Sequence, residues 1–174
     1  MKNTLFILLL FIVANTTSVI AQEEETDREN KTTFGIRGGI NGSFSRDFTE
    51  IEFHGGLFAE TRLSKHWSIQ NELNVSYGGV GNISLGVPIF IKYHFTDKFS
   101  VFGGPRLDVD ISRGFITQFN DPTRLPSPVG LSAEIGAQYN ITKRFFVEAR
   151  YNYSIINTSR LNNNNLQIGF GFKF

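Results

Sequence analysis

The sequence predicts an all-β protein, an eight-stranded antiparallel up-and-down transmembrane β-barrel with short periplasmic turns and longer extracellular loops. Three observations carry this prediction. From residue 33 onward, apolar residues alternate with small or polar ones, which is the side-chain period of a β-strand. Three short turns repeat one residue pattern, and ionisable side chains are confined to one face of the strands.

The N-terminal residues 1–21 are expected to form a secretory signal peptide. Lys2 precedes the apolar run from Leu5 to Ala14, and Val19-Ile20-Ala21 resembles a cleavage site. The run is too short for a helix that crosses a bilayer. A buried core helix is the alternative, but the acidic and polar residues after it disfavour that reading. Residues 22–32 are expected to be a polar periplasmic tether, which leaves residues 33–174 as the barrel domain.

Composition excludes several kinds of function. The 174 residues contain no cysteine, so there is no disulfide framework, thiol nucleophile or cysteine zinc site. Lys and Arg number 17 against 16 Asp and Glu, and this balance gives no electrostatic footprint for a nucleic acid.

Alternation defines each predicted strand. It is strictest in the last one, where one face carries Leu166, Ile168, Phe170, Phe172 and Phe174. The same pattern defines seven earlier strands, around residues 34–40, 51–63, 67–77, 83–95, 99–109, 129–139 and 147–155. A length of about ten residues matches the strands that cross a bilayer at a tilt.

The connections between these strands are of two kinds. Leu63–Trp67, Phe95–Phe99 and Ile141–Phe145 each read apolar, Ser or Thr, two polar residues, aromatic. Parity requires odd-length hairpin loops here, so the first and last residue of each segment should face each other. The other connections, 43–50, 78–82, 111–127 and 157–165, are longer or irregular. This asymmetry is typical of an outer-membrane barrel with both ends of its strand series in the periplasm.

Charge distinguishes a barrel in lipid from a barrel in water. The face predicted to point inward carries Arg37, Glu52, His54, Glu60, Arg62, Glu72, Lys92, His94, Arg106, Asp108, Asp110, Glu134, Glu148, Arg150 and Lys173. The opposite face carries no ionisable group except tyrosine, whereas a soluble barrel has the reverse arrangement. A cationic side chain facing lipid would cost about 2–4 kcal/mol at mid-membrane. The nearly balanced inward charges predict internal pairing and a plugged lumen.

Aromatic residues and prolines add two expectations. Aromatic side chains should form a girdle near the short turns and termini: Phe34, Trp67, Tyr93, Phe95, Phe99, Tyr139, Phe145, Phe172 and Phe174. A smaller set should lie at the other rim: Phe53, Tyr77 and Tyr153. Pro105 should lie opposite Ile89, beside Pro88, so we expect a bulge or kink there, with Gly103 and Gly104 supplying flexibility.

Several segments resemble one family. Leu85–Tyr93 followed by Gly103–Leu107 looks like the paired "iP…KY" and "GP" strands of the PorT-like outer-membrane β-barrel family of Bacteroidetes. Phe34–Asn41 resembles that family's first strand, and Val147–Tyr151 resembles its penultimate one. The resemblance covers nearly all of residues 33–174 and implies an eight-stranded barrel in the outer membrane. The family's namesake takes part in type IX protein secretion, but that role transfers to no particular residue here.

No catalytic, cofactor-binding or metal-binding residues are expected. His54, His66 and His94 fall on different strands or in a turn, without a second ligand at metal spacing. A lipid hydrolase would need a Ser, a His and a carboxylate together; His54 with Glu52 and Ser43 or Ser45 is the one candidate set, but His54 should point inward, away from lipid. Gly38-Gly39 and Gly78-Gly79 lack the strand-to-helix context of a phosphate-binding loop.

The functional expectation is a non-enzymatic integral outer-membrane barrel that acts through exposed loops in partner binding or envelope maintenance. Its expected partners are outer-membrane lipids and a protein at the loop 111–127, and the barrel should be a monomer. A lipid-modifying hydrolase, a small-solute channel and a soluble ligand-binding barrel are the alternatives. Asp108 and Asp110, the inward acids nearest that loop, should pair with Arg106 or Arg113.

Overall fold

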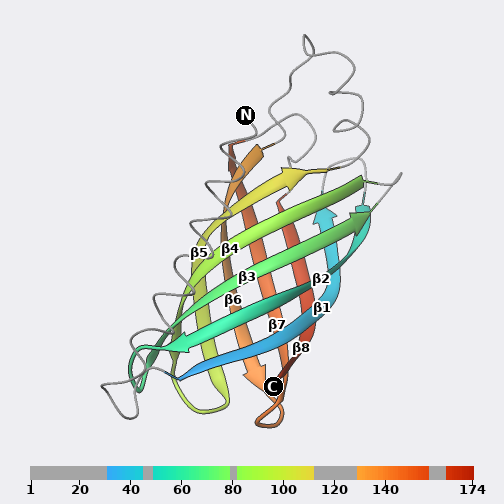
Figure 1. Cartoon of the computed structure of the whole chain (residues 1–174). Helices are drawn as coiled ribbons and strands as arrows, with labels where there is room; N and C mark the ends of the chain where they lie inside the picture. The colour runs from blue at the N-terminus through green and yellow to red at the C-terminus, as the bar shows by residue number, and fades with distance from the viewer. Residues whose placement is uncertain (1–30, 45–48, 79–81, 112–128, 157–163) are drawn as a thin grey trace. The chain divides into compact units, whose positions relative to one another are not determined.

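The computed structural model describes residues 31–44, 49–78, 82–111, 129–156 and 164–174. Within these ranges the chain forms a closed barrel in which each strand pairs with its neighbours in sequence order and β1 also pairs with β8 (Figure 1). The strands are β1 (Thr32–Phe44), β2 (Thr49–Arg62), β3 (Trp67–Gly78), β4 (Asn82–His94), β5 (Phe99–Asp110), β6 (Val129–Asn140), β7 (Phe145–Ile156) and β8 (Asn165–Lys173).

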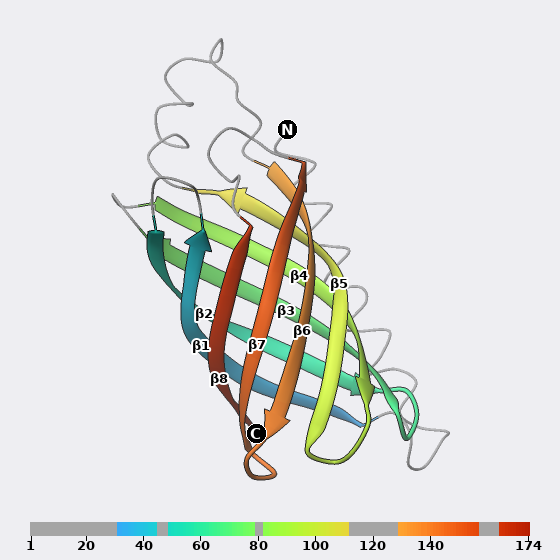
Figure 2. The same cartoon turned by 180° about the vertical axis from the view of Figure 1, so that it is seen from behind.

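All eight strand pairs are antiparallel, including the β1–β8 pair that closes the ring. The predicted all-β barrel and its strand number are therefore confirmed. The β2–β3, β4–β5 and β6–β7 turns lie at the same end as the end of β8 (Figures 1 and 2). The strand ends that flank the other connections lie at the opposite end. The described residues contain no helix long and apolar enough to cross a membrane.

The three short turns share one hydrogen-bond pattern, as their sequence repeat predicts. The backbone N–H groups of Leu63, Phe95 and Ile141 donate to the carbonyls of Trp67, Phe99 and Phe145 at 2.9–3.1 Å. In each turn the Ser or Thr hydroxyl oxygen accepts the N–H of the aromatic residue, at 3.2 Å in the first turn, 3.0 Å in the second and 2.9 Å in the third. The backbone hydrogen bonds confirm the predicted facing pairs. The hydroxyl stabilises each turn because it satisfies N–H groups that the tight loop leaves free.

The prolines interrupt the ladder without the predicted bulge. On the β4–β5 side, pairing stops between Pro88↔Arg106 and Ile91↔Gly103 and resumes in the same register, which keeps Ile89 at the level of Pro105. A proline lacks the N–H for a ladder hydrogen bond but does not require an extra residue. A Cβ at Gly104 would collide with the Ile89 carbonyl, so this glycine permits a close backbone approach. The register shift that the structure does contain lies between β6 and β7, at Leu131 and Ser132.

Three of the four long connections are shorter than the sequence pattern predicts. Backbone pairing continues through Ser43↔Glu50 and Phe44↔Thr49, so the first connection is shorter than the predicted 43–50. Hydrogen bonding between strands can extend past the last side chain that shows the alternation, which is why the pattern ends early. Gly78, Asn82 and Asn165 likewise belong to strands. The predicted signal peptide 1–21, residues 22–30 of the tether and residues 112–127 of the proposed partner loop lie outside the described residues, whereas Thr32 is already part of β1.

The two faces of the barrel wall differ as predicted. Apolar side chains cover the outside: Phe170 is 66% exposed and Ile135 is 62% exposed. Ionisable side chains fill the inside: Arg150 is 1% exposed and Glu134 is 0% exposed. The aromatic residues expected near the short turns are at those strand ends, and most of them are exposed. This inside-out arrangement is the one that a lipid surrounding imposes.

Four phenylalanines are exceptions to the polar lining of the barrel, and the sequence analysis did not predict them. Phe58, Phe90, Phe102 and Phe146 point inward and are buried. Three of them pair across the sheet with inward-facing glycines: Phe58 with Gly35, Phe102 with Gly136 and Phe146 with Gly171. A Cβ on any of these glycines would collide with the phenyl ring, so each ring fills the space above a glycine. Phe–Gly pairing across strands is the signal that could have identified them.

Candidate functional site

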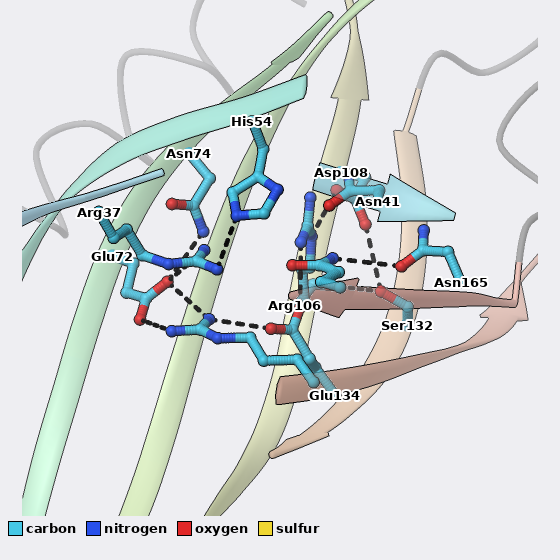
Figure 3. A network of polar contacts seen from close by, with 12 residues as sticks. Arg37, Asn41, His54, Glu72, Asn74, Arg106, Asp108, Ser132, Glu134 and Asn165 are labelled. Atoms are coloured by element: carbon cyan, nitrogen blue, oxygen red, sulfur yellow. Dashed lines mark hydrogen bonds and ion pairs between the residues drawn. The ribbon is translucent and has the colours of Figure 1, made fainter. Parts of the chain in front are cut away.

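A network of buried charged side chains lies inside the barrel. Its central cluster consists of Arg37, Glu72, Glu134, Glu148 and Arg150, contributed by β1, β3, β6 and β7. Figure 3 shows Arg37, Glu72 and Glu134 of this cluster. Arg150 donates to Glu72 at 2.7 and 2.9 Å, to Glu134 at 2.9 Å and to Glu148 at 2.8 Å. Arg37 donates to Glu148 at 2.6 Å and to Glu72 at 3.3 Å. Each carboxylate of the cluster therefore accepts hydrogen bonds from two arginines. Glu72 and Glu148 accept from Arg37 and Arg150. Glu134 accepts from Arg150 and from Arg106, which lies outside the cluster.

Arg106 extends the central cluster toward the end with the long connections. It donates to Glu134 at 3.0 Å and to Asp108 at 2.7 Å, and Ser132 donates to the other Asp108 oxygen at 3.1 Å. The predicted pairing of Asp108 with Arg106 is confirmed. The side chain of Asp110 and all of Arg113 lie outside the described part of the chain.

A second group, centred on Lys92, extends the network toward the short turns. Lys92 donates to Glu60 at 3.1 Å and to the side-chain oxygens of Gln70 and Gln138, both at 2.7 Å. Gln70 in turn donates to Glu72, which joins the Lys92 group to the central cluster. Glu60 also accepts from Ser68 and lies 3.2 Å from His94. These neutral partners matter because a buried ion pair needs further hydrogen bonds to offset its desolvation.

The phenylalanines that point inward also contact the cations. The Arg150 guanidinium lies 4.7 Å from the Phe102 ring centroid and 5.1 Å from that of Phe90. Lys92 is 5.7 Å from the Phe102 ring, and Lys173 is 5.5 Å from the Phe146 ring. Cations over aromatic faces gain electrostatic energy in a water-poor interior. Charged groups and rings together occupy the space between the strands.

A small polar pocket lies above this network at the end with the long connections. Its volume is about 60 Å³, and residues from all eight strands line it, among them Asn41, Glu52, Arg106, Asp108 and Asn152. The side-chain oxygens of Asn41 and Asn152 are buried and have no hydrogen-bond partner among the described residues. Apart from Gly130 and Leu131, the lining is entirely polar or charged.

Not every predicted inward charge joins the network. Glu52 is half-buried and accepts a long hydrogen bond from Asn41, at 3.5 Å. Arg62 lies at the end of β2, where it donates to the Lys65 carbonyl at 3.3 Å. Lys173, by contrast, reaches the edge of the network, 3.7 Å from Glu60 at the short-turn end. The sequence pattern gives the face of each residue but not its height in the barrel, and height decides which charges meet.

The three histidines lie apart, each with a different neighbour. His54 is buried inside the barrel, 3.0 Å from Arg37, and His94 is 2.8 Å from Ser68. His66 is exposed in the first short turn and stacks on Tyr93. No group of three or more His, Asp or Glu side chains suited to a metal ion occurs in the described ranges. For the hydrolase alternative, His54 points inward as expected, while the side chains of Ser43 and Ser45 are not among those described.

Comparison with known proteins identifies the same architecture. Residues 6–174 match the family described as "Outer membrane protein beta-barrel domain". The backbone structure of the Yersinia pestis outer membrane protein Ail in phospholipid bilayer nanodiscs is similar, with a TM-score of 0.58 and 15% identity, over 83% of this chain and 100% of that one. The N-terminal β-barrel domain of Pseudomonas aeruginosa OprF has a TM-score of 0.51 and 14% identity, over 84% and 100%.

A protein designed de novo without a natural ancestor is similar to the same degree. The solution structure of the design TMB2.3 has a TM-score of 0.54 and 15% identity, over 86% of this chain and 98% of the design. No curated protein sequence matches this chain significantly. At these identities the solved structures show a shared fold, and the family match covers nearly the whole chain. The chain therefore belongs to the outer membrane protein β-barrel domain family and is a protein of the outer membrane.

Proposed function

We propose that this protein is a non-enzymatic outer-membrane barrel with a plugged lumen, which acts through the connections at one end of the barrel. The observation that carries the proposal is the Arg150–Glu72 contact. Arg150 is on β7 and Glu72 on β3, four strands apart in a ring of eight, so the contact joins opposite walls. An eight-stranded barrel is only wide enough for side chains to fill its interior.

The energetics of this arrangement disfavour conduction. Arg150, Glu72, Glu134 and Glu148 are at most 4% exposed, and each makes at least two charged contacts. An ion entering the lumen would have to replace several charge-assisted hydrogen bonds at once, and separating a buried ion pair leaves an uncompensated charge. We therefore expect the purified barrel to be silent in planar bilayers.

The test of the plug compares three proteins in planar bilayers. The wild-type barrel should show no steady conductance, and Arg37→Ala/Glu72→Ala/Arg150→Ala should conduct because the middle of the lumen is emptied. Asp97→Asn, in an exposed turn, is the control and should be silent. Steady wild-type conductance would overturn the plugged lumen and favour the channel. Heat-dependent mobility in gels checks that each variant is folded.

We also propose that the short turns face the periplasm and that the long connections face the exterior, where the 111–127 connection binds a partner or supports the envelope. The asymmetry of loop lengths supports this orientation. Because the chain has no cysteine, single cysteines report the topology cleanly. In intact cells Thr117→Cys should react with a membrane-impermeant maleimide, whereas Lys98→Cys should react only after the cells are broken. The reverse pattern would contradict the orientation.

The hydrolase alternative is tested through the lipid. His54 is enclosed in the lumen beside Arg37, away from any acyl chain outside the wall. Deletion of the gene, and separately His54→Ala, should therefore leave the acylation of lipid A unchanged by mass spectrometry. A change that depends on His54 would make the protein an enzyme.

A finer proposal concerns the branch of the family. The segments Leu85–Tyr93 and Gly103–Leu107 resemble the PorT-like barrels of Bacteroidetes, and they lie on the adjacent strands β4 and β5. We propose membership of that branch, and the resemblance by itself assigns no role in secretion. A deletion strain tests that role separately, because loss of type IX cargo from the medium would assign it.

A further inference from the structure

The three short turns carry basic side chains at equivalent places. After the Ser or Thr, the turns read Lys65-His66, Asp97-Lys98 and Lys143-Arg144. Lys65, Lys98, Lys143 and Arg144 are all exposed. We call these four residues the basic rim. Asp97 is the one acidic residue among the six turn positions, so this rim is clearly cationic.

Backbone hydrogen bonds fix the basic rim to the barrel wall. The carbonyls of His66, Lys98 and Arg144 each accept an N–H from the end of a neighbouring strand, at 2.8 Å in all three cases. The donors are His94, Asn140 and Lys173. Each turn is therefore hydrogen-bonded to the end of a neighbouring strand as well as to its own two strands. The basic side chains consequently project from defined positions around much of one end.

No carboxylate among the described residues neutralises the charge of the basic rim. Every ion pair among the described residues involves a side chain of the barrel interior, and none involves a rim residue. Five cations inside the barrel, by contrast, each have at least one carboxylate partner: Arg37, Lys92, Arg106, Arg150 and Lys173. The rim therefore presents free cationic groups to whatever lies beside this end of the barrel.

What lies there is indicated by the adjacent aromatic residues. Trp67 contacts Tyr93 and Tyr93 contacts Phe95, with ring centroids 4.8 Å apart in both cases. On the other side Phe145 and Phe172 are 4.9 Å apart. Trp and Tyr on the outer wall of a membrane protein mark the boundary between hydrocarbon and headgroups. Since the turns begin immediately beyond these rings, the basic rim lies at the depth of the lipid headgroups.

We propose that the basic rim binds the phosphates of anionic phospholipids, so that the barrel gathers a lipid such as phosphatidylglycerol around its short-turn end. Basic groups held next to a bilayer attract anionic lipids, and the attraction is strongest within a Debye length of the surface. Four cations without an ion-pair partner in the described part of the chain, placed at headgroup depth, meet that condition. The proposal goes beyond the proposed function and holds whichever side of the membrane the short turns face.

The single tryptophan makes this measurable. Trp67 directly follows the first basic turn and is the only tryptophan of the chain. The full barrel is reconstituted in mixed vesicles of phosphatidylcholine and phosphatidylglycerol in which one lipid or the other carries brominated chains, which quench indole fluorescence on contact. Brominated phosphatidylglycerol should quench Trp67 as if its local fraction were about twice the bulk fraction, because each nearby cation favours the anionic lipid. Added sodium chloride should abolish the difference by screening.

Matched variants separate the basic rim from a general lipid effect. Lys65→Gln/Lys98→Gln/Lys143→Gln/Arg144→Gln should lose the selectivity, while Asp97→Asn should increase it. Moving the reporter to the far end of the same strand, with Trp67→Phe/Tyr77→Trp, should show no preference for phosphatidylglycerol. All variants change exposed positions, and heat-dependent mobility in gels confirms that each is folded.

Three results would overturn the proposal. The first is equal quenching of wild-type Trp67 by both brominated lipids. The second is selectivity that survives in the fourfold glutamine variant, and the third is the same selectivity with the reporter at position 77. A negative result would leave the plugged lumen untouched, because conductance tests that independently.

Discussion

The guanidinium of Arg150 donates two hydrogen bonds to the carboxylate of Glu72, Nη1 to Oε2 at 2.9 Å and Nη2 to Oε1 at 2.7 Å. The two side chains come from opposite walls of the barrel and are both completely enclosed. A bidentate pair of this kind is directional as well as strong. It therefore fixes the distance between walls that share no backbone hydrogen bond.

Removing the charge of Glu72 should destabilise the barrel strongly. Glu72→Gln leaves Arg37 and Arg150 with one acceptor fewer and places an amide N–H group against their donors. The expected loss in the free energy of unfolding is about 3 kcal/mol, measured by urea titration in vesicles. Ser100→Ala is the control, since the buried Ser100 hydroxyl has no partner and its loss should be nearly neutral. Equal effects of the two substitutions would show that the pair contributes little.

Inward and outward glycines should respond differently to an added methyl group. A Cβ at Gly171 would overlap the Phe146 ring, whereas a Cβ at Gly55 on the outer wall would meet only the Arg37 carbonyl, at 3.7 Å. Gly171→Ala should lower the free energy of unfolding by about 2 kcal/mol because the ring must move. Gly55→Ala should leave it unchanged or raise it slightly. If Phe146→Leu removed the penalty of Gly171→Ala, the contact between the two residues would be established as its cause.

Asn71 is a polar residue on the lipid-facing wall, between Trp67 and Tyr77 on β3. It is exposed on the outside, and its side chain makes no hydrogen bond to the described residues. An amide facing hydrocarbon without a partner is costly. Asn71→Leu should therefore raise the free energy of unfolding in vesicles by about 1 kcal/mol or more. A loss of stability would mean that the amide has a partner in the membrane.

The Thr142 hydroxyl should contribute measurably to the third turn. It accepts the N–H groups of Arg144 at 3.2 Å and Phe145 at 2.9 Å. Thr142→Ala should cost about 1 kcal/mol, as for other hydroxyls that satisfy free backbone N–H groups. Thr142→Ser should restore most of the loss, since Ser64 serves the same purpose in the first turn. An equal loss in both variants would attribute the effect to the threonine methyl group.

Alternation along the sequence was enough to predict the strands and the face of the wall that each side chain occupies. Period-two alternation suffices for this, because a strand directs successive side chains to opposite sides. Thus Phe170 lies outside and Arg150 inside, as predicted. The repeated turns determined the facing pairs such as Leu63 and Trp67, since hairpin geometry depends only on neighbouring residues.

The sequence pattern does not predict which inward-facing side chains contact one another, and the folded structure is needed to show this. Arg150 could have paired with several carboxylates, and the selection of Glu72, Glu134 and Glu148 depends on the stagger of the strands around the closed ring. The same stagger places Phe146 over Gly171 and lets the ladder pass Pro105 without a bulge. Alternation carries no information on height along the barrel axis. Closure of the β1–β8 pair sets that height, and it joins residues from the two ends of the strand series.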